Sequence, residues 1–575
     1  MENSTNYYEA LYDVKRNFLI IGLTGYTGAG CSQCREIIET NEKPIFPSFD
    51  VIGKSHLSEG FQCESQDAYY TGKSERDRRI FDKLKRTWDE TKWLQFIPIE
   101  FSVVIFSSVI YQSLFSERKN ATLDAVRALS TPHKDSLQNL RLLWEDKLPR
   151  ETSTLKEIIQ SYETSKEILS KYKACFKNKW SFLKLMQYFG DQIRKYGLVF
   201  PEKGTTPRKD NLFKIPEAVR RLIKAHYWIK TETTGGPYHF VVDAFRNPLE
   251  IEYFKWRYSE FYLVGVLRND IERNSSLDIQ NKNFKALNKR EQGNLYAKKT
   301  NNIAKWISSQ NVYECLQKAD LYIENKYDTS RTFSSLRFHL IKLITLAKNP
   351  GCIPPTKDER NMQIAMTAKQ MSGCISRQVG ATIANSKGFI AGVGWNDPPS
   401  GQTPCSLRTR AELINGGSTS AFSEYERSSA FIRHLQSNGS HNKPFCFRHE
   451  LSELEGKKKK NEFTRALHAE ENAFFQAIQS QPNGTDSTTL YTTSRTCTLC
   501  AKKAYQLGVK RIVYIEEYTD IAIEQTLKTG DKQIVIDRFQ GITGAAFFRL
   551  YSSLIPEKDI IQLYTESALR HAEKK

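Results

Sequence analysis

Short apolar runs rich in β-branched residues recur through the first 330 residues, and they constrain the fold more than any other feature of the chain. The clearest lie at residues 18–23 (FLIIGL), 101–110 (FSVVIFSSVI), 238–245 (YHFVVDAF), 261–267 (FYLVGVL) and 321–325 (LYIEN). Segments of helical character separate these runs. Short buried strands that alternate with helices are typical of a parallel sheet covered by helices. We therefore predict an α/β, doubly wound domain over residues 1–350.

A mostly helical stretch lies between the second and third runs. From about residue 111 to 236, apolar residues fall at helical spacing, as in TLKEIIQSYETSKEILSKYKACF. This stretch forms either an inserted helical subdomain or a plain helical layer over the sheet, and the sequence leaves both open. Farther on, the prolines and glycine of LAKNPGCIPPTKDER (346–360) indicate a linker. A second domain is thus predicted over residues 351–575.

The second domain begins with a helical segment, MQIAMTAKQM, and two alternating strands in VGATIANSKGFIAGVGWN that meet at a Ser-Lys-Gly turn. Residues 400–465 are irregular in pattern and include the run KKKK at 457–460, so we predict a long surface insertion there.

Charge and cysteine content narrow the class of protein. The 575 residues include 84 Lys and Arg against 65 Asp and Glu, a net charge of +19, which favours anionic partners such as nucleotides or nucleic acid. The 11 cysteines are too few and too scattered for a secreted disulfide framework. The first residues are polar, and the run that follows is too short for a signal peptide or membrane span. We expect a cytoplasmic protein with no membrane contact.

A glycine-rich turn follows the first strand, in FLIIGLTGYTGAGCS. It resembles the phosphate-binding loop G-x-x-x-x-G-K-[ST], with candidate phosphate contacts at Gly25, Thr27, Gly28, Gly30 and Ser32. Cys31 stands where that motif has lysine, so phosphoryl transfer is disfavoured while nucleotide binding stays open. Asp243 ends a predicted strand and is a candidate for holding Mg²⁺ beside a bound nucleotide. The alternative is a glycine turn and an aspartate with purely structural roles.

Residues 15–345 therefore resemble P-loop nucleoside and nucleotide kinases. The resemblance rests on this glycine turn and on the stretch VVDAFRNPLEIEYF.

A histidine, an acid and a cysteine pair form the clearest chemical pattern. His468 and Glu470 lie in LHAEENAFFQA, and Cys497 and Cys500 follow in TCTLC. One imidazole and two thiolates are three ligands of a catalytic zinc site that keeps a fourth position open. A carboxylate beside that position can move protons. Residues i and i+2 do not share a helix face, so the histidine and glutamate need a helix start or another special placement.

H-x-E followed by C-x-x-C is the signature of zinc-dependent nucleobase deaminases, and LHAEENAFFQA resembles the deoxycytidylate deaminase branch. The resemblance implies an α/β/α cytidine-deaminase-like domain in which His468, Cys497 and Cys500 bind Zn²⁺ and Glu470 shuttles protons. The sequence departs from the family at Thr496, where proline usually precedes the first cysteine.

The stretch SGCISRQVGATIANSKGFIAGVGWNDPPSG also resembles this family, which makes Asn396 a candidate sugar or base contact and Arg377 a candidate phosphate contact. Both residues also have plain structural readings. A second, structural zinc site is a weaker hypothesis, because its candidate ligands have irregular spacing; they are Cys405, His441, Cys446 and His449.

Together the two halves resemble bacterial antiviral deoxycytidylate deaminase fusions. The resemblance implies deamination of dCTP and/or dCMP, control through the N-terminal domain by a small RNA or a nucleotide, and a homo-oligomer, commonly a hexamer in related enzymes. Two other readings remain. The basic chain could deaminate single-stranded DNA or RNA, or it could be a catalytically silent regulator that binds nucleotide or RNA.

Overall fold

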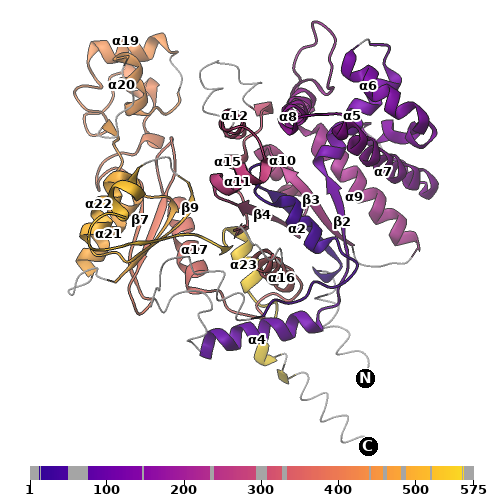
Figure 1. The fold of residues 1–575 in the computed structure, drawn as a ribbon. Helices are drawn as coiled ribbons and strands as arrows, with labels where there is room; N and C mark the ends of the chain where they lie inside the picture. Colours follow the sequence, from indigo (N-terminus) through magenta and orange to yellow (C-terminus); the bar gives the residue numbers. More distant parts are fainter. Residues whose placement is uncertain are drawn as a thin grey trace, which may run out of the picture. The chain divides into compact units, whose positions relative to one another are not determined.

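The computed structural model describes residues 12, 15–48, 75–118, 120–145, 148–233, 238–292, 307–326, 333–439, 442–456, 463–480, 487–517, 521–559 and 561–562. Its contacts divide the chain into two compact units (Figure 1). The N-terminal unit comprises Met1–Pro354 with Ala545–Lys575, and the C-terminal unit comprises Pro355–Gly544. None of the described helices is long and apolar enough to cross a membrane.

A parallel sheet forms the centre of the N-terminal unit, in the strand order β5-β4-β1-β3-β2. Its strands are β1 (Phe18–Thr24), β2 (Phe96–Glu100), β3 (Tyr238–Phe245), β4 (Phe261–Leu267) and β5 (Leu321–Glu324). Four of the predicted strands are confirmed by β1, β3, β4 and β5. The chain moves one way along the sheet from β1 to β2 and the other way from β2 through β5, so right-handed crossovers place helices on both faces. The predicted parallel sheet of an α/β domain is therefore confirmed.

The predicted strand at 101–110 is wrong. These residues begin the helix α5 (Phe101–Phe115), and the strand β2 precedes them. The segment is apolar on every side, and a run of this kind suits a helix surrounded by protein as well as a buried strand. Most residues of α5 are indeed buried. The spacing of its apolar residues therefore does not distinguish a helix from a strand.

The predicted helical stretch is confirmed and is built around α5. It contains α6 (Ala121–Ser130), α7 (Thr152–Ala174), α8 (Lys179–Tyr196) and α9 (Lys214–Thr233). All four pack against α5, and α5 packs against β2 and β3. The stretch is thus a small helical subdomain within the connection from β2 to β3, rather than a single layer over the sheet.

The chain after residue 544 differs from the predicted domain arrangement. Residues 545–575 group with the N-terminal unit rather than with the second domain. The helix α23 (Ala545–Tyr551) packs against α16 (Ser334–Lys348), and the backbone N–H of Gly351 donates a hydrogen bond of 2.8 Å to the carbonyl of Leu550. A sequence pattern shows that α23 has an apolar face but not which helix covers it.

The C-terminal unit has a mixed sheet in the order β10-β9-β8-β6-β7. Its strands are β6 (Gly380–Ala384), β7 (Ile390–Trp395), β8 (Thr489–Ser494), β9 (Arg511–Glu516) and β10 (Val535–Arg538). The predicted hairpin is confirmed, since β6 pairs antiparallel with β7 and also with β8, whereas β8, β9 and β10 run parallel. The helices α17 (Lys357–Lys369) and α21 (Ala469–Ser480) contact both β6 and β7.

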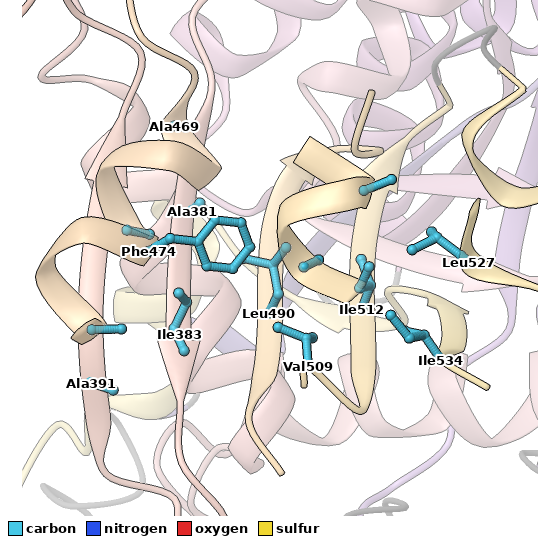
Figure 2. Packing of buried hydrophobic residues seen from close by; sticks show 14 of the residues in the cluster. Ala381, Ile383, Ala391, Ala469, Phe474, Leu490, Val509, Ile512, Leu527 and Ile534 are labelled. Carbon is cyan, nitrogen blue, oxygen red and sulfur yellow. The ribbon is translucent and has the colours of Figure 1, made fainter. Parts of the chain in front are cut away.

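Small residues allow α21 to approach the sheet closely. A Cβ added to Gly394 would lie 2.1 Å from the carbonyl oxygen of Ala469, and one on Gly392 would lie 2.3 Å from that of Ala473. Beside this contact, Phe474 extends from α21 toward Leu490 of β8 in the core of the unit (Figure 2). The register of α21 on the sheet is therefore fixed by backbone contact, which leaves no room for adjustment.

The predicted irregular insertion at 400–465 is partly wrong, because much of it is folded. It contains α18 (Arg410–Ile414), α19 (Ser429–Ser437) and α20 (Phe447–Leu454), which enclose a small aromatic and aliphatic core. Arg408 and Glu426 form an ion pair inside it with almost no exposure. The lysine run at 457–460 lies outside the described residues.

Replacing Gly394 by alanine should destabilise the C-terminal unit by about 1–3 kcal/mol, since the added methyl group overlaps the backbone of α21. Thermal or chemical denaturation monitored by circular dichroism measures this. Lys387→Ala, at the exposed hairpin turn, is the matched control and should change stability by less than about 0.5 kcal/mol. Equal stability of the two variants would contradict the close contact.

Candidate functional site

The helix α21 begins immediately after His468, and this placement solves the problem of the H-x-E spacing. The carbonyl of His468 accepts a hydrogen bond of 3.1 Å from the N–H of Asn472, so His468 is the N-cap and Glu470 lies in the first turn. As the N-cap residue, His468 lies outside the regular helix, and His468 and Glu470 line the same cavity. The special placement that the sequence required is a helix start.

The cysteine pair lies at another helix start. Cys497 is the N-cap of α22 (Thr498–Gln506), directly after β8, and Cys500 lies in its first turn. The predicted helix opening at the cysteines is confirmed. The positive end of the helix dipole stabilises thiolates at this position.

The three potential metal ligands converge. The Nδ1 atom of His468 lies 3.3 Å from the sulfur of Cys497 and 3.3 Å from the sulfur of Cys500. All three ligand atoms lie within 4.8 Å of one another. One imidazole nitrogen and two sulfurs at this spacing, with both cysteines buried, are a donor set that suits zinc. The atom that faces the sulfurs is Nδ1, which the sequence could not specify.

Burial and hydrogen bonding adjust the acidity of this cluster. A hydrogen bond from the thiol of Cys500 lowers the pKa of Cys497 to about 4, so one thiolate is available for a cation. The hydrogen bond to Cys497 raises the pKa of His468 to about 9. Burial raises the pKa of Glu470 to about 7, and only 4% of this residue is exposed. A carboxyl group with a pKa near neutrality can both accept and donate a proton.

A cavity of about 200 Å³ opens over these residues. Asn396 and Arg377 both line it, as the sequence predicted, but both also have partners within the protein. The amide of Asn396 accepts a 2.6 Å hydrogen bond from the N–H of Val379 and donates one of 2.7 Å to the carbonyl of Arg377. Arg377 lies 2.6 Å from a carboxylate oxygen of Glu516. Their proposed contacts with a substrate stay predictions.

Two cavity arginines were missed by sequence reasoning. Arg448 reaches the cavity from α20 of the insertion, and Arg495 from the segment between β8 and Cys497. The spacing of Arg495 from Cys497 was visible in the sequence, but nothing in the sequence placed the insertion beside the cavity. With Arg377, three arginines therefore line the cavity.

The glycine turn of the N-terminal unit lies beside a separate, larger cavity of about 910 Å³. Of the predicted phosphate contacts, the residues that line it are Thr27, Gly28, Gly30, Ser32 and Asp243. Gly25 lies at the start of the same turn and is buried. A Cβ atom added to Gly25 would lie 2.6 Å from the carbonyl oxygen of Val266.

Two of these residues show features that bear on phosphate binding. Gly30 adopts φ of 120°, a conformation that favours glycine. Asp243 lies 3.6 Å from Arg35, and burial raises the pKa of its carboxyl to about 6.

Among the described residues, the candidate ligands of the predicted second zinc site do not form a converging group. Cys405 and Cys446 line one small pocket, and Cys374 lines it too. His449 lies 3.4 Å from Glu453, and His441 lies outside the described residues. Within the described part of the chain, the potential ligand atoms of the three cysteines do not all come within 4.8 Å of one another.

An ion pair joins the two helices that carry the candidate ligands. The carboxylate of Glu471 accepts a 2.7 Å hydrogen bond from the backbone N–H of His468 and pairs with Lys503 of α22. Lys503→Met should lower zinc affinity about 10–100-fold, because partners outside the ligand set hold the ligands in place. Competition with a chromogenic chelator measures the affinity. Lys502→Met, on an exposed neighbouring position, is the control; equal affinities would contradict a positioning role.

Known proteins resemble the C-terminal unit. Residues 355–516 match the family model of the cytidine and deoxycytidylate deaminase zinc-binding region. The deoxycytidylate deaminase of Enterobacteria phage T2 is 30% identical over 167 residues, which cover 27% of this chain and 78% of the phage protein. That of Schizosaccharomyces pombe is 27% identical over 187 residues, covering 32% of this chain and 45% of its own length. The chain thus spans less than half of the yeast relative.

Among solved structures, the apo dCMP deaminase of the cyanophage S-TIM5 is 21% identical, with a TM-score of 0.19, over 32% of this chain and 96% of that one. The match to the phage T2 protein covers most of that relative. The family-model match, over residues 355–516, contains the histidine, glutamate and cysteines described above. The chain therefore belongs to the deoxycytidylate deaminase family of zinc-dependent enzymes.

Proposed function

We propose that this protein hydrolyses the exocyclic amine of deoxycytidine nucleotides, dCMP and/or dCTP, to give the deoxyuridine nucleotide and ammonia. The observation that carries the proposal is the convergence of His468, Cys497 and Cys500. Two of these ligands, His468 and Cys497, line one cavity together with the buried residue Glu470. Zinc deaminases use this set of groups, with the glutamate outside the metal ligands.

The residues have separable roles in this reaction. His468, Cys497 and Cys500 would hold zinc, which supplies Lewis acidity at the cavity. Glu470 takes a proton from the attacking water as the oxygen bonds to C4 of cytosine. The same carboxyl then delivers the proton to the exocyclic nitrogen as the C4–N bond breaks. Its pKa of about 7 suits both transfers at neutral pH.

The phosphate end of the substrate fits the basic wall of the cavity. Arg377, Arg448 and Arg495 line it together with Asn396. Guanidinium groups bind phosphate oxygens in a two-pronged manner, so we assign them to the phosphates of the nucleotide. Since Arg448 comes from the insertion, this segment contributes to substrate binding.

We further propose that the N-terminal unit is a P-loop kinase-like domain that binds a nucleotide, with Mg²⁺ at Asp243, and controls the deaminase. The position of the cavity supports this, because ligands of doubly wound sheets bind at the carboxyl ends of the strands where the connections reverse direction. A small RNA is the other candidate effector. The proposed setting is a cytoplasmic homo-oligomer that depletes deoxycytidine nucleotides during phage infection, a role that rests on the resemblance of the two halves to antiviral fusions.

Glu470→Gln should lower deamination about 10²–10⁴-fold while zinc stays bound, because the amide cannot carry the proton. The assay follows dCMP, dCTP, CTP and single-stranded DNA by chromatography, with zinc content measured in parallel. Glu524→Gln, on an exposed position of the same unit, should keep full activity. Turnover confined to single-stranded DNA would contradict a nucleotide substrate.

Removal of zinc with a chelator should abolish turnover, and added Zn²⁺ should restore it. Cys500→Ala should prevent this recovery, because it deletes one of the sulfur ligands. Metal analysis by mass spectrometry and the deamination rate are the two readouts. Undiminished turnover by protein shown to be free of metal would contradict the proposed chemistry.

A further inference from the structure

A buried carboxylate occupies the glycine turn of the N-terminal unit. Glu291 ends α12 (Asn281–Glu291) and is completely buried. Its carboxylate oxygens accept hydrogen bonds of 3.1 and 3.2 Å from the backbone N–H of Thr27, and one also accepts from the Thr27 hydroxyl. An acidic side chain from 264 positions away in the sequence thus lies where the loop offers its donors.

Two arginines complete the surroundings of this carboxylate. Arg246, from the segment after β3, forms an ion pair with Glu291, and Arg273 lies 3.6 Å from its second oxygen. A backbone N–H, a hydroxyl and guanidinium groups around one anion are also the donors that proteins use to bind a phosphoryl group. The site is therefore built for an anion, and the anion it holds belongs to the protein.

Arg246 places a positive charge beside the glycine turn, which lacks the lysine of the phosphate-binding motif. Cys31 stands at the lysine position, and burial raises the pKa of its thiol, so it carries no charge at neutral pH. Arg246 lines the same cavity as Thr27 and the glycines, and its side chain is 23% exposed. The positive charge that the loop lacks is thus supplied from the end of a neighbouring strand.

We propose that Thr27 and Arg246 form the phosphoryl subsite of a nucleoside polyphosphate, and that Glu291 is an internal competitor that must leave before the ligand binds. This inference builds on the nucleotide-binding role proposed above for the N-terminal unit and adds its regulation. A protein that must first release an internal partner binds with an affinity reduced by the fraction of open molecules. Glu291→Gln keeps the size of the side chain and removes the charge that holds it.

Calorimetric titration of the full-length, zinc-loaded protein with ATP and with inorganic tripolyphosphate tests the proposal. We expect Glu291→Gln to bind both at least about tenfold more tightly than the unaltered protein, because the competing charge is gone. Arg246→Met should weaken binding by about tenfold or more, since it removes the main cation of the subsite. Glu90→Gln, an exposed position of α4 (Glu75–Glu90) in the same unit, should bind as the unaltered protein does.

Hydrogen exchange of the unaltered protein provides a second test that needs no variant. ATP should slow amide exchange in the loop at residues 25–30 and speed it in α12, as Glu291 is released. Slower exchange in the loop with no change in α12, or equal affinities of Glu291→Gln and the unaltered protein, would overturn the competition. Binding that Arg246→Met leaves intact would overturn the subsite. Absence of binding in every variant would overturn nucleotide binding by the N-terminal unit as well, whereas deamination by the C-terminal unit is measured independently.

Discussion

Close contact between the backbone of β7 and that of α21 determines where the chemistry of this protein can occur. Gly392 and Gly394 present no side chain to the helix, and Ala469 and Ala473 lie against them. Because α21 cannot shift along the strand, its first residue is fixed relative to the sheet. The sheet in turn carries β8, which delivers the cysteines to the start of α22. Within the described residues, the histidine and sulfur ligands are therefore both carried by elements that pack on one sheet.

Both units place functional groups at the start of a helix that follows a strand. In the C-terminal unit, β8 leads to Cys497 and α22, and the cysteines gain from the helix dipole. In the N-terminal unit, β1 leads through the glycine turn to α2 (Cys31–Ile38), and the backbone N–H of Thr27 in this turn faces a carboxylate. The first arrangement suits a cation held by thiolates and the second suits a phosphoryl group. The difference comes from the residues at the turn, since the backbone layout is similar.

Local patterns in the sequence predicted the strands that alternate with helices, the hairpin and the candidate metal ligands. These features depend on residues near one another in the chain: the C-x-x-C spacing places two sulfurs in one helical turn, and a helix start reconciles His468 with Glu470. The segment at 101–110 was assigned wrongly because it is apolar on all sides, so its pattern has no period.

Features that depend on tertiary packing could not be predicted. Arg448 reaches the cavity only because the insertion folds beside it, and Glu291 meets Thr27 across 264 positions. Neither relation leaves a local pattern. The same reason explains α23, which packs against α16, a helix about 200 positions earlier in the chain, and so belongs to the N-terminal unit. The candidate reacting groups could thus be proposed from local patterns, whereas the groups that surround them became visible only in the fold.

Hydrolytic deamination can be tested by following the atoms of the reaction. Purified protein of known zinc content is incubated with dCMP and dCTP in water enriched in ¹⁸O, and the products are analysed by mass spectrometry together with an ammonia assay. We expect one ammonia released and one ¹⁸O atom gained in the base for each deoxyuridine nucleotide formed. Consumption of the nucleotide without ammonia, or no turnover by fully zinc-loaded protein in the presence and absence of ATP, would contradict hydrolytic deamination.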